Sequence, residues 1–334
     1  MENVEKPLLT LVVNCYKFER FVEEALDGAF AQTYRPLEIV ISDDHSPDGT
    51  WDKVQAKVKE FLAKHPEVPC RDLSNEMFPQ TISAPEAPLS IVLNRNGMNL
   101  GLARHQNRLF ELSHGEWVAF QSGDDVSVPD RMEKIAERVM ENPRIRCLHS
   151  GVKIVDGAGI DIEVSRSFER QRHRKGDGLP AILGAGAVYH RDVYSLFGPL
   201  GPFVKNEDHV LPLRASLIGD IEYIEDALVK YCKHGDNLSG SFSTNPELAI
   251  YKRFEALDAL YPCLDDINRA ELDGLASLPK LMTLRRRVNE EIFLQWFVGH
   301  WQKRVLSRMK LLALLFSKPS HILYFISRCI DKFA

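Results

Sequence analysis

The sequence predicts an α/β fold in which a mixed, mainly parallel sheet is flanked by helices and followed by a C-terminal helical extension. Three observations lead to this prediction. Short apolar runs alternate with amphipathic helical patterns over residues 1–150. Polar residues follow directly after those runs, as they do at the ligand-binding edge of parallel sheets. Beyond about residue 245, helical patterns with little glycine replace the alternation.

Length and composition exclude several classes of protein. The 334 residues are 44% hydrophobic and 27% charged, which fits one elaborate globular domain or a domain with an appendage rather than a disordered or fibrous chain. The formal net charge of −5 does not favour a nucleic-acid partner. The six cysteines are far apart and form no Cys-x-x-Cys pair, which argues against a structural zinc site or a disulfide framework and fits a reducing cytosol.

The first two predicted strands are each followed by a predicted helix. Residues 8–13 are almost wholly apolar and indicate a buried strand, and apolar side chains at three- and four-residue spacing over 18–29 indicate one face of a helix. Residues 37–42 form the second apolar run. The Asp-Gly-Thr sequence at 48–50 then provides a turn and a helix start, and the apolar side chains of 51–62 share one helical face.

The third and fourth strands are expected at 90–94 and 117–121, with a helix near 102–112 between them. The interval 66–89 contains five prolines and is expected to be an irregular surface insertion. Such an insertion can be a lid over a site or only a spacer, and the sequence leaves both alternatives open.

A second polar interval, at about 156–180, includes a basic cluster from Arg166 to Lys175. That cluster is expected to be a solvated loop or a segment that contacts phosphate groups. Strand-like sequence returns at 187–189.

The C-terminal segment 301–334 is basic and amphipathic, with seven Lys and Arg against the single acidic residue Asp331, and Pro319 interrupts its helical pattern. It is expected either to pack on the protein core or a second subunit, or to contact an anionic membrane surface. No run approaches the roughly 20 apolar residues that span a bilayer, and no signal peptide is apparent at the N-terminus. We therefore expect a cytoplasmic protein, with peripheral contact at the inner face of the cell membrane as an alternative.

Polar clusters follow three of the predicted strands: Asn14-Cys15-Tyr16, Asp43-Asp44 and Ser122-Gly123-Asp124-Asp125. If these strands are neighbours, the clusters meet at one edge of the sheet. Adjacent carboxylates in a crevice need a cation, and Mg²⁺ or Mn²⁺ is typically held by one or two carboxylates with water and phosphate oxygens. Asp124-Asp125 is therefore a candidate metal-diphosphate site, although an Asp pair can also cap a helix or a turn.

Motifs of other enzyme classes are missing from the sequence. There is no Walker-type phosphate loop, and Gly184-Ala185-Gly186 lacks the third glycine of a dinucleotide fingerprint. There is also no Gly-x-Ser-x-Gly nucleophile turn and no His-Glu-x-x-His zinc helix. These absences disfavour P-loop, dinucleotide-dependent, serine-hydrolase and zinc-protease functions.

Three stretches in order along the chain resemble family 2 glycosyltransferases of the GT-A fold. Residues 9–50 resemble the nucleotide-binding half, which ends in Asp-Asp-x-Ser-x-Asp-Gly-Thr. Residues 99–132 resemble the Asn-x-Gly stretch and the metal-binding Asp motif followed by Pro-Asp-Arg, and 206–239 resemble the Glu-Asp motif and the Tyr-Arg-x-His-Gly-x-Asn-Leu-Ser ending of bacterial surface-polysaccharide transferases.

The resemblance implies a GT-A domain over residues 1–240, with a nucleotide-binding half at 1–132 and an acceptor-side half at 133–240. Residues 241–334 would then be a C-terminal helical region with a basic amphipathic end.

The resemblance also implies roles for individual residues. The nucleotide would be bound by Asn14 and Tyr16 at the base and ribose, by Asp44 at the base, and by Arg104. Asp124 would contact the ribose or share the metal, and Asp125 would hold Mn²⁺ or Mg²⁺ on the donor diphosphate. Asp208 would be the general base, with Glu207 contacting the acceptor, and His234 would pack the strand-end loop or contact the donor phosphates.

The sequence departs from the family pattern at three positions within the matching stretches. Gly123 stands where the first Asp of the Asp-x-Asp motif is usual, Cys232 replaces a common Arg, and His45 replaces a small residue after the Asp pair. These departures concern nucleotide preference and acceptor geometry more than the fold.

The resemblance predicts an inverting glycosyltransferase that moves a sugar from a nucleotide-diphosphate donor, expected to be a UDP-sugar, to a saccharide or lipid-linked acceptor in polysaccharide biosynthesis. One alternative is a non-catalytic nucleotide-sugar-binding or scaffold protein of the same fold. A sugar nucleotidyltransferase is disfavoured because it would need a glycine-rich basic loop near the N-terminus, where Asn14-Cys15-Tyr16 stands instead.

Overall fold

The computed structural model describes most of the chain, namely residues 6–74, 87–157, 159–165, 179–180, 182–204, 207–234 and 246–303. Within these ranges the side chains are described except at 163–165, 246–255 and 296–303. The basic cluster at Arg166 to Lys175 and residues 304–334 of the basic C-terminal segment lie outside the described residues.

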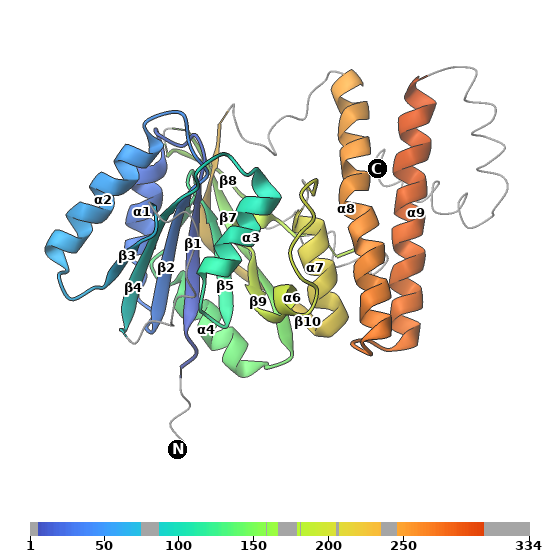
Figure 1. Ribbon diagram of the computed structural model, residues 1–334, viewed down its shortest axis with the longest axis horizontal. Helices are drawn as coiled ribbons and strands as arrows, with labels where there is room; N and C mark the ends of the chain where they lie inside the picture. The colour runs from blue at the N-terminus through green and yellow to red at the C-terminus, as the bar shows by residue number, and fades with distance from the viewer. Residues whose placement is uncertain are drawn as a thin grey trace.

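A ten-stranded mixed sheet forms the centre of the molecule, with strand order β3-β4-β2-β1-β5-β9-β7-β10-β6 and β8 beside β7 (Figure 1). The strands are β1 Leu9–Cys15, β2 Leu37–Asp43, β3 Cys70–Asp72, β4 Leu89–Arg95, β5 Trp117–Ser122, β6 Val126–Ser127, β7 Ile145–Asp156, β8 Asp161–Ser165, β9 Val188–His190 and β10 Asp220–Lys233.

Helices cover both faces of the sheet and extend beyond it. They are α1 Val22–Phe30, α2 Thr50–Lys64, α3 Leu102–Leu112, α4 Arg131–Glu141, α6 Asp192–Ser195, α7 Glu207–Ile218, α8 Pro246–Leu272 and α9 Leu278–Lys303, with a 3₁₀ turn at Gly184–Gly186. The predicted α/β architecture with a C-terminal helical extension is confirmed.

Strand β1 lies in the parallel part of the sheet and pairs with both β2 and β5. The register places Asn14 opposite Ser42 on one side and Ser122 on the other. The neighbour relation expected from the sequence is therefore correct, and the polar residues that follow these strands meet at one carboxyl edge.

Alternate residues of each strand enter two hydrophobic cores, because successive side chains point to opposite faces of a sheet. Val12 and Val118 pack with α3, α7 and α8 on one face. Leu11 and Ala119 pack with α1, α2 and α4 on the other face. Full burial of each large aliphatic side chain stabilises the fold by roughly 1.5–3 kcal/mol.

The α8–α9 hairpin packs against α7 on the side of the molecule away from β3 (Figure 1). Leu260 of α8 and Val288 of α9 belong to the same core cluster as Val210 of α7. A buried ion pair of 2.8 Å between Arg214 Nε and Asp266 Oδ2 also joins α7 to α8, with side-chain exposures of 4% and 8%. The hairpin and the sheet domain thus share one core.

The structure adds elements that the sequence patterns did not predict. Strand β3 lies within the proline-rich interval that was expected to be irregular, where it pairs with β4. Helix α4 and the long strands β7 and β10 were also not anticipated. In β10 charged residues interrupt the apolar ones, because most of its side chains are only half-buried.

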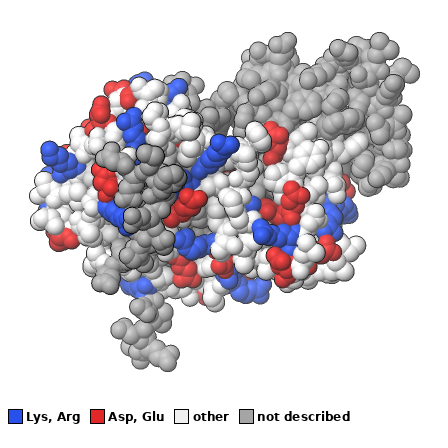
Figure 2. Space-filling model, viewed as in Figure 1, with Lys and Arg blue, Asp and Glu red and all other residues white. Residues whose placement is uncertain are grey.

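None of the described helices is both long and apolar enough to cross a bilayer. On the face shown in Figure 2, basic and acidic side chains of the described residues are interspersed, and neither sign forms one continuous patch.

Candidate active site

The carboxyl edge of β1, β2 and β5 brings the three predicted polar clusters together. The Asp44 backbone N–H donates to the Cys15 carbonyl at 2.9 Å, and the Gly123 N–H donates to the Asn14 carbonyl at 2.8 Å. A Cβ atom at position 123 would lie 2.9 Å from the Phe18 ring and 3.1 Å from Cys15 Sγ. This close packing explains why glycine stands at position 123.

The Asp44 carboxylate is 3% exposed and accepts hydrogen bonds from the loop before α3. Oδ1 accepts from Asn96 Nδ2 at 2.8 Å and from the Leu100 N–H at 2.9 Å. Oδ2 accepts from the Gly101 N–H at 3.0 Å. Gly101 has a φ of 77°, a left-handed conformation that glycine adopts without strain. Asp44 therefore connects the end of β2 to the start of α3.

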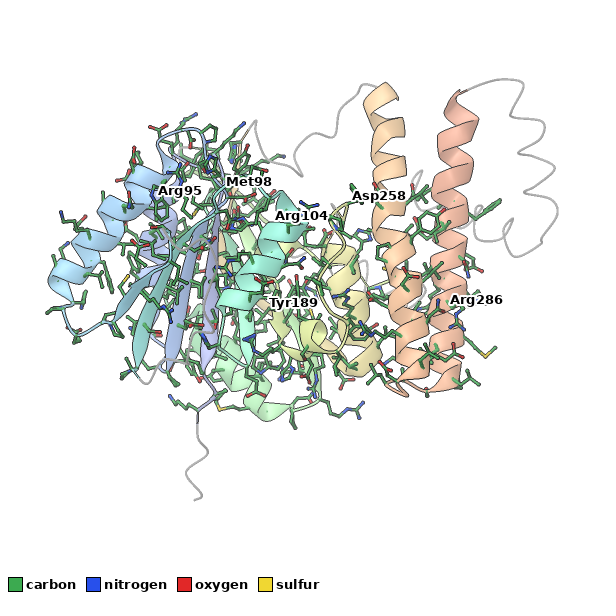
Figure 3. The ribbon with its side chains drawn as sticks, viewed as in Figure 1. Arg95, Met98, Arg104, Tyr189, Asp258 and Arg286 are labelled. Atoms are coloured by element: carbon green, nitrogen blue, oxygen red, sulfur yellow. The ribbon has the colours of Figure 1, made fainter. Side chains whose placement is uncertain are left out.

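The other predicted nucleotide-binding residues lie at the same edge. Asn14 is half-buried at the end of β1, and the Tyr16 ring is 36% exposed, with Lys17 Nζ 5.3 Å from its centre. Arg104 is exposed on the first turn of α3. Figure 3 shows Arg104 and Met98 near the upper rim, above Tyr189 in the sheet.

Asp124 contacts a histidine from the far end of the domain. His234 Nε2 lies 2.9 Å from Asp124 Oδ2, and the imidazole stacks on the Phe21 ring with centroids 4.6 Å apart. His234 follows the last residue of β10, so this contact joins the turn after β5 to the end of β10. The sequence signal for it was the histidine of the ending motif, whose partner could not be identified without the fold.

Asp125 is buried like its neighbour, which is 6% exposed, but has a different partner. It is 1% exposed, and its Oδ1 accepts the Cys232 N–H at 3.0 Å. Burial, followed by the charge of Asp124, raises the Asp125 pKa well above its usual range, while the Cys232 N–H and the Arg131 charge oppose this rise. Burial also lowers the pKa of Arg131 to about 10. Asp125 thus holds β10 against the turn that follows β5.

The donor set around Asp124 fits a cation that arrives with a diphosphate. Among the described residues, no cluster of three or more His, Cys, Asp or Glu side chains is arranged to hold a metal ion. Asp124 and His234 together provide two ligand groups from separate segments. Mg²⁺ and Mn²⁺ commonly use one or two protein carboxylates and complete their shell with water and phosphate oxygens.

Glu207 and Asp208 form the first turn of α7, where the helix macrodipole favours negative charge. Burial, followed by the charge of Asp208, raises the Glu207 pKa to about 8. A Cβ atom at Gly184 would lie 3.7 Å from Glu207 Oε1, so this carboxyl group faces the 3₁₀ turn before β9.

The register of β9 places the Glu207–Asp208 pair at the same edge as Asp124. The Phe120 N–H of β5 donates to the Ala187 carbonyl at 2.9 Å, and β9 runs antiparallel to β5. The residues that precede Ala187, including Gly184, therefore extend toward the carboxyl end of β5. The fold thus brings the predicted nucleotide, metal and base residues to one edge of the sheet.

Comparisons with known proteins show the family and the fold of this chain. The family model described as glycosyl transferase family 2 matches residues 10–70 and 81–197. Putative glycosyltransferase EpsE of Bacillus subtilis is 24% identical over 46% of each chain, and an uncharacterized glycosyltransferase of Nostoc sp. is 23% identical over 72% of this chain and 70% of that protein.

Two solved structures share the fold. The mannosyltransferase PcManGT of Pyrobaculum calidifontis, solved with GDP-Man and Mn²⁺, superposes with a TM-score of 0.55 at 17% identity, covering 99% of this chain and 88% of that chain. TarS 1-349 of S. aureus, solved with UDP-GlcNAc, superposes with a TM-score of 0.52 at 16% identity, covering 89% and 81%. The predicted GT-A fold is therefore confirmed.

Proposed function

The chain belongs to glycosyl transferase family 2, and we propose that it transfers a sugar from a nucleoside diphosphate donor to a hydroxyl group of a carbohydrate or lipid-linked acceptor, with inversion at the anomeric carbon. The contact between Asp124 and His234 carries this proposal. It places a carboxylate and an imidazole together at the edge where Asp44 and Asp208 also lie.

Nucleotide recognition is assigned to the edge of β1 and β2. In this proposal Asn14 and Tyr16 contact the base and ribose, and Asp44 accepts a hydrogen bond from the base. Arg104 makes no ion pair with another described residue, so its guanidinium is available to the nucleotide anion.

The divalent cation is assigned first to Asp124, with His234 beside it. Asp125, which the family resemblance favours as the principal ligand, is engaged with the Cys232 N–H and lies deeper in the protein. A bound Mn²⁺ or Mg²⁺ would stabilise the negative charge that develops on the departing nucleoside diphosphate. Asp125 would fix the end of β10 and thereby the position of His234.

Proton transfer is assigned to Asp208. Glu207 holds a proton at neutral pH because its pKa is raised to about 8, so Asp208 is the member of the pair proposed to accept the acceptor hydroxyl proton. The attacking oxygen then forms the new glycosidic bond as the bond to the diphosphate breaks. A single displacement of this kind needs no covalent nucleophile and inverts the anomeric centre.

PcManGT was solved with GDP-Man and TarS with UDP-GlcNAc, so the shared fold accommodates both nucleotides. We propose UDP as the donor nucleotide here, and a bacterial surface polysaccharide or lipid-linked oligosaccharide as the product. Peripheral association with the cytoplasmic membrane face through residues 301–334 belongs to the same proposal.

A thermal-shift panel tests the donor and cation assignments. UDP, GDP, CMP and dTDP are each added with and without Mn²⁺ to the wild-type protein and to the Asp124→Ala and Asp125→Ala variants. A ligand that binds only the folded state, added at 100 times its Kd, stabilises that state by about 2.7 kcal/mol. We expect one nucleotide to give a Mn²⁺-dependent rise in Tm that Asp124→Ala loses.

The two variants distinguish the alternative cation sites. If Asp125→Ala alone loses the Mn²⁺ dependence, the cation belongs to Asp125 and the proposed arrangement is wrong. If no nucleotide raises the Tm of the wild-type protein, the nucleotide site itself is contradicted.

A further inference from the structure

A buried chain of hydrogen bonds runs behind Asp44 from helix α3 to the ends of β2 and β4. His105 Nε2 lies 2.8 Å from Ser42 Oγ, and Asn94 Nδ2 lies 2.8 Å from the same oxygen. Asn94 Nδ2 is also 3.0 Å from Asn96 Oδ1, and Asn96 Nδ2 is 2.8 Å from Asp44 Oδ1. All five side chains are at least nine-tenths buried.

One direction of donation satisfies every member of this chain. Burial lowers the His105 pKa to about 4, so the ring is neutral and one of its nitrogens accepts. Asn94 donates one amide hydrogen to Ser42 and the other to Asn96. In the tautomer with an unprotonated Nε2, the Ser42 hydroxyl donates its hydrogen to His105 Nε2. With its oxygen already accepting, Asn96 presents its amide nitrogen to Asp44.

This direction determines how much of the Asp44 carboxylate is left for a ligand. Oδ1 accepts from Asn96 and from the Leu100 N–H, which occupies both of its lone pairs. Oδ2 accepts from the Gly101 N–H and keeps one lone pair. A reversed Asn96 amide would direct an oxygen at Asp44 and repel it. The orientation of Asp44 therefore depends on the whole chain.

We infer that His105 is a positioning residue for nucleotide binding, because it orients Asp44 through Ser42, Asn94 and Asn96 so that Oδ2 faces the base N–H of a nucleoside diphosphate. This inference rests on the proposed nucleotide-binding role of Asp44. Arg104, next to His105 in α3, is exposed on the outer side of the helix. Its guanidinium takes no part in this chain of hydrogen bonds.

Substitutions at position 105 separate the acceptor function from simple packing. His105→Leu removes the acceptor for the Ser42 hydroxyl, while His105→Gln keeps an acceptor oxygen near the position of Nε2. Gln106→Leu is the matched control, because Gln106 is 5% exposed on the same helix and its Oε1 has no hydrogen-bond partner in the described structure. Kd values are measured by calorimetry for UDP, GDP and Mn²⁺-pyrophosphate.

We expect His105→Leu to raise the Kd of the nucleoside diphosphate that binds the wild-type protein by about tenfold, the effect of losing a well-placed hydrogen bond. His105→Gln should restore most of the affinity, and Gln106→Leu should match the wild-type protein. The Kd of Mn²⁺-pyrophosphate should be the same in all four proteins, because it has no base. A general structural defect would weaken pyrophosphate binding as well.

A double substitution tests whether the effect passes through Ser42. In the Ser42→Ala background, His105→Leu should produce no further rise in the nucleotide Kd. If the two effects add, or if His105→Leu binds nucleotide as tightly as the wild-type protein, the inference is wrong. Should His105→Leu fail to fold, Ser42→Ala alone must still raise the nucleotide Kd, and wild-type affinity in that variant would overturn the inference.

Asp44→Asn separates a failure of this inference from a failure of the proposed function. If Asp44→Asn leaves the nucleotide Kd unchanged, Asp44 does not bind the base, and both proposals fail. If Asp44→Asn weakens binding but His105→Leu does not, only the positioning role of His105 is rejected.

Discussion

Strand β2 has a buried carboxylate near each end, Glu38 at its amino end and Asp44 just past its carboxyl end, and different groups surround the two. Glu38 Oε2 accepts from Thr10 Oγ1 at 2.7 Å and from the His114 N–H at 2.8 Å, and its Oε1 lies 2.6 Å from His114 Nδ1. The guanidinium of Arg191 also interacts with this carboxylate. Asp44 accepts from three neutral donors.

Glu38 and Asp44 accept similar numbers of hydrogen bonds, so this number does not separate a structural carboxylate from one proposed to bind a ligand. Glu38 lies among groups that can carry positive charge, so its charge is balanced within the protein and it joins strands and loops at the amino edge. The neutral donors of Asp44 orient it but leave its charge to interact with a ligand. We therefore expect substitutions at the carboxyl edge to change binding and turnover, and substitutions at the amino edge to change stability.

The largest effect on the carboxyl edge is expected at Asp208. Asp208→Asn should lower kcat for sugar transfer by about 100- to 10,000-fold, because an amide cannot accept the acceptor hydroxyl proton. The Kd of the donor nucleotide and the Tm should stay near wild-type values. Asp226→Asn, at an exposed carboxylate that pairs with Lys134, is the control and should retain turnover. Full turnover in Asp208→Asn would exclude Asp208 as the base.

At the amino edge, Glu38→Ala should lower the free energy of unfolding by about 3 kcal/mol, because the buried donors from Thr10 and His114 lose a charged acceptor. Urea unfolding measures this loss. The nucleotide Kd of the folded protein should be unchanged, since Glu38 is at the opposite end of β2 from Asp44. A matched rise in nucleotide Kd would show that the two edges are coupled and would contradict the comparison.

Asp44→Asn is the counterpart of Glu38→Ala on the same strand. It should raise the nucleotide Kd by about tenfold to a hundredfold, because a charged acceptor is replaced by a weaker neutral one. Its free energy of unfolding should fall by only about 1 kcal/mol, since most of the surrounding donors can still be satisfied. Calorimetry and urea unfolding on the same preparation give both values. A large loss of stability without a change in Kd would make Asp44 a structural residue like Glu38.

Glu207 represents a third way to accommodate a buried carboxyl group, which is to keep its proton. Its pKa is raised from 4.5 to about 8, so between these pH values the folded protein binds more protons than the unfolded chain. The contribution of protonated Glu207 to the free energy of unfolding is fully present below pH 4.5 and is lost as the pH rises toward 8. Glu207→Gln cannot ionise and should lose less stability than the wild-type protein across this window.

Urea unfolding of both proteins at several pH values across that window measures the difference in slope. Equal slopes of the free energy of unfolding against pH would show that Glu207 is ionised in the folded protein throughout this window. Glu207 could then also accept the proton, and Asp208 would not be the single candidate for the base.

Much of the fold could be predicted from the sequence where apolar runs are uninterrupted. Strands β1, β2, β4 and β5 are buried on both faces, so their sequences contain few polar residues and are easily recognised. Strand β10 escaped prediction because charged residues alternate with apolar ones along a half-exposed strand. Strand β3 escaped prediction because three residues in a proline-rich interval carry no periodic signal.

The sequence by itself determined that Asp44, Asp124 and Asp125 follow apolar strands, and it predicted one shared edge on the condition that those strands are neighbours. Only the tertiary structure decided what each carboxylate faces. Asp124 and Asp125 are adjacent in the chain, yet one contacts His234 and the other the backbone of Cys232. Adjacent side chains point in different directions, and their partners lie more than 100 positions away along the chain. Local sequence patterns carry no information about such distant contacts, which are formed by the packing of the whole sheet.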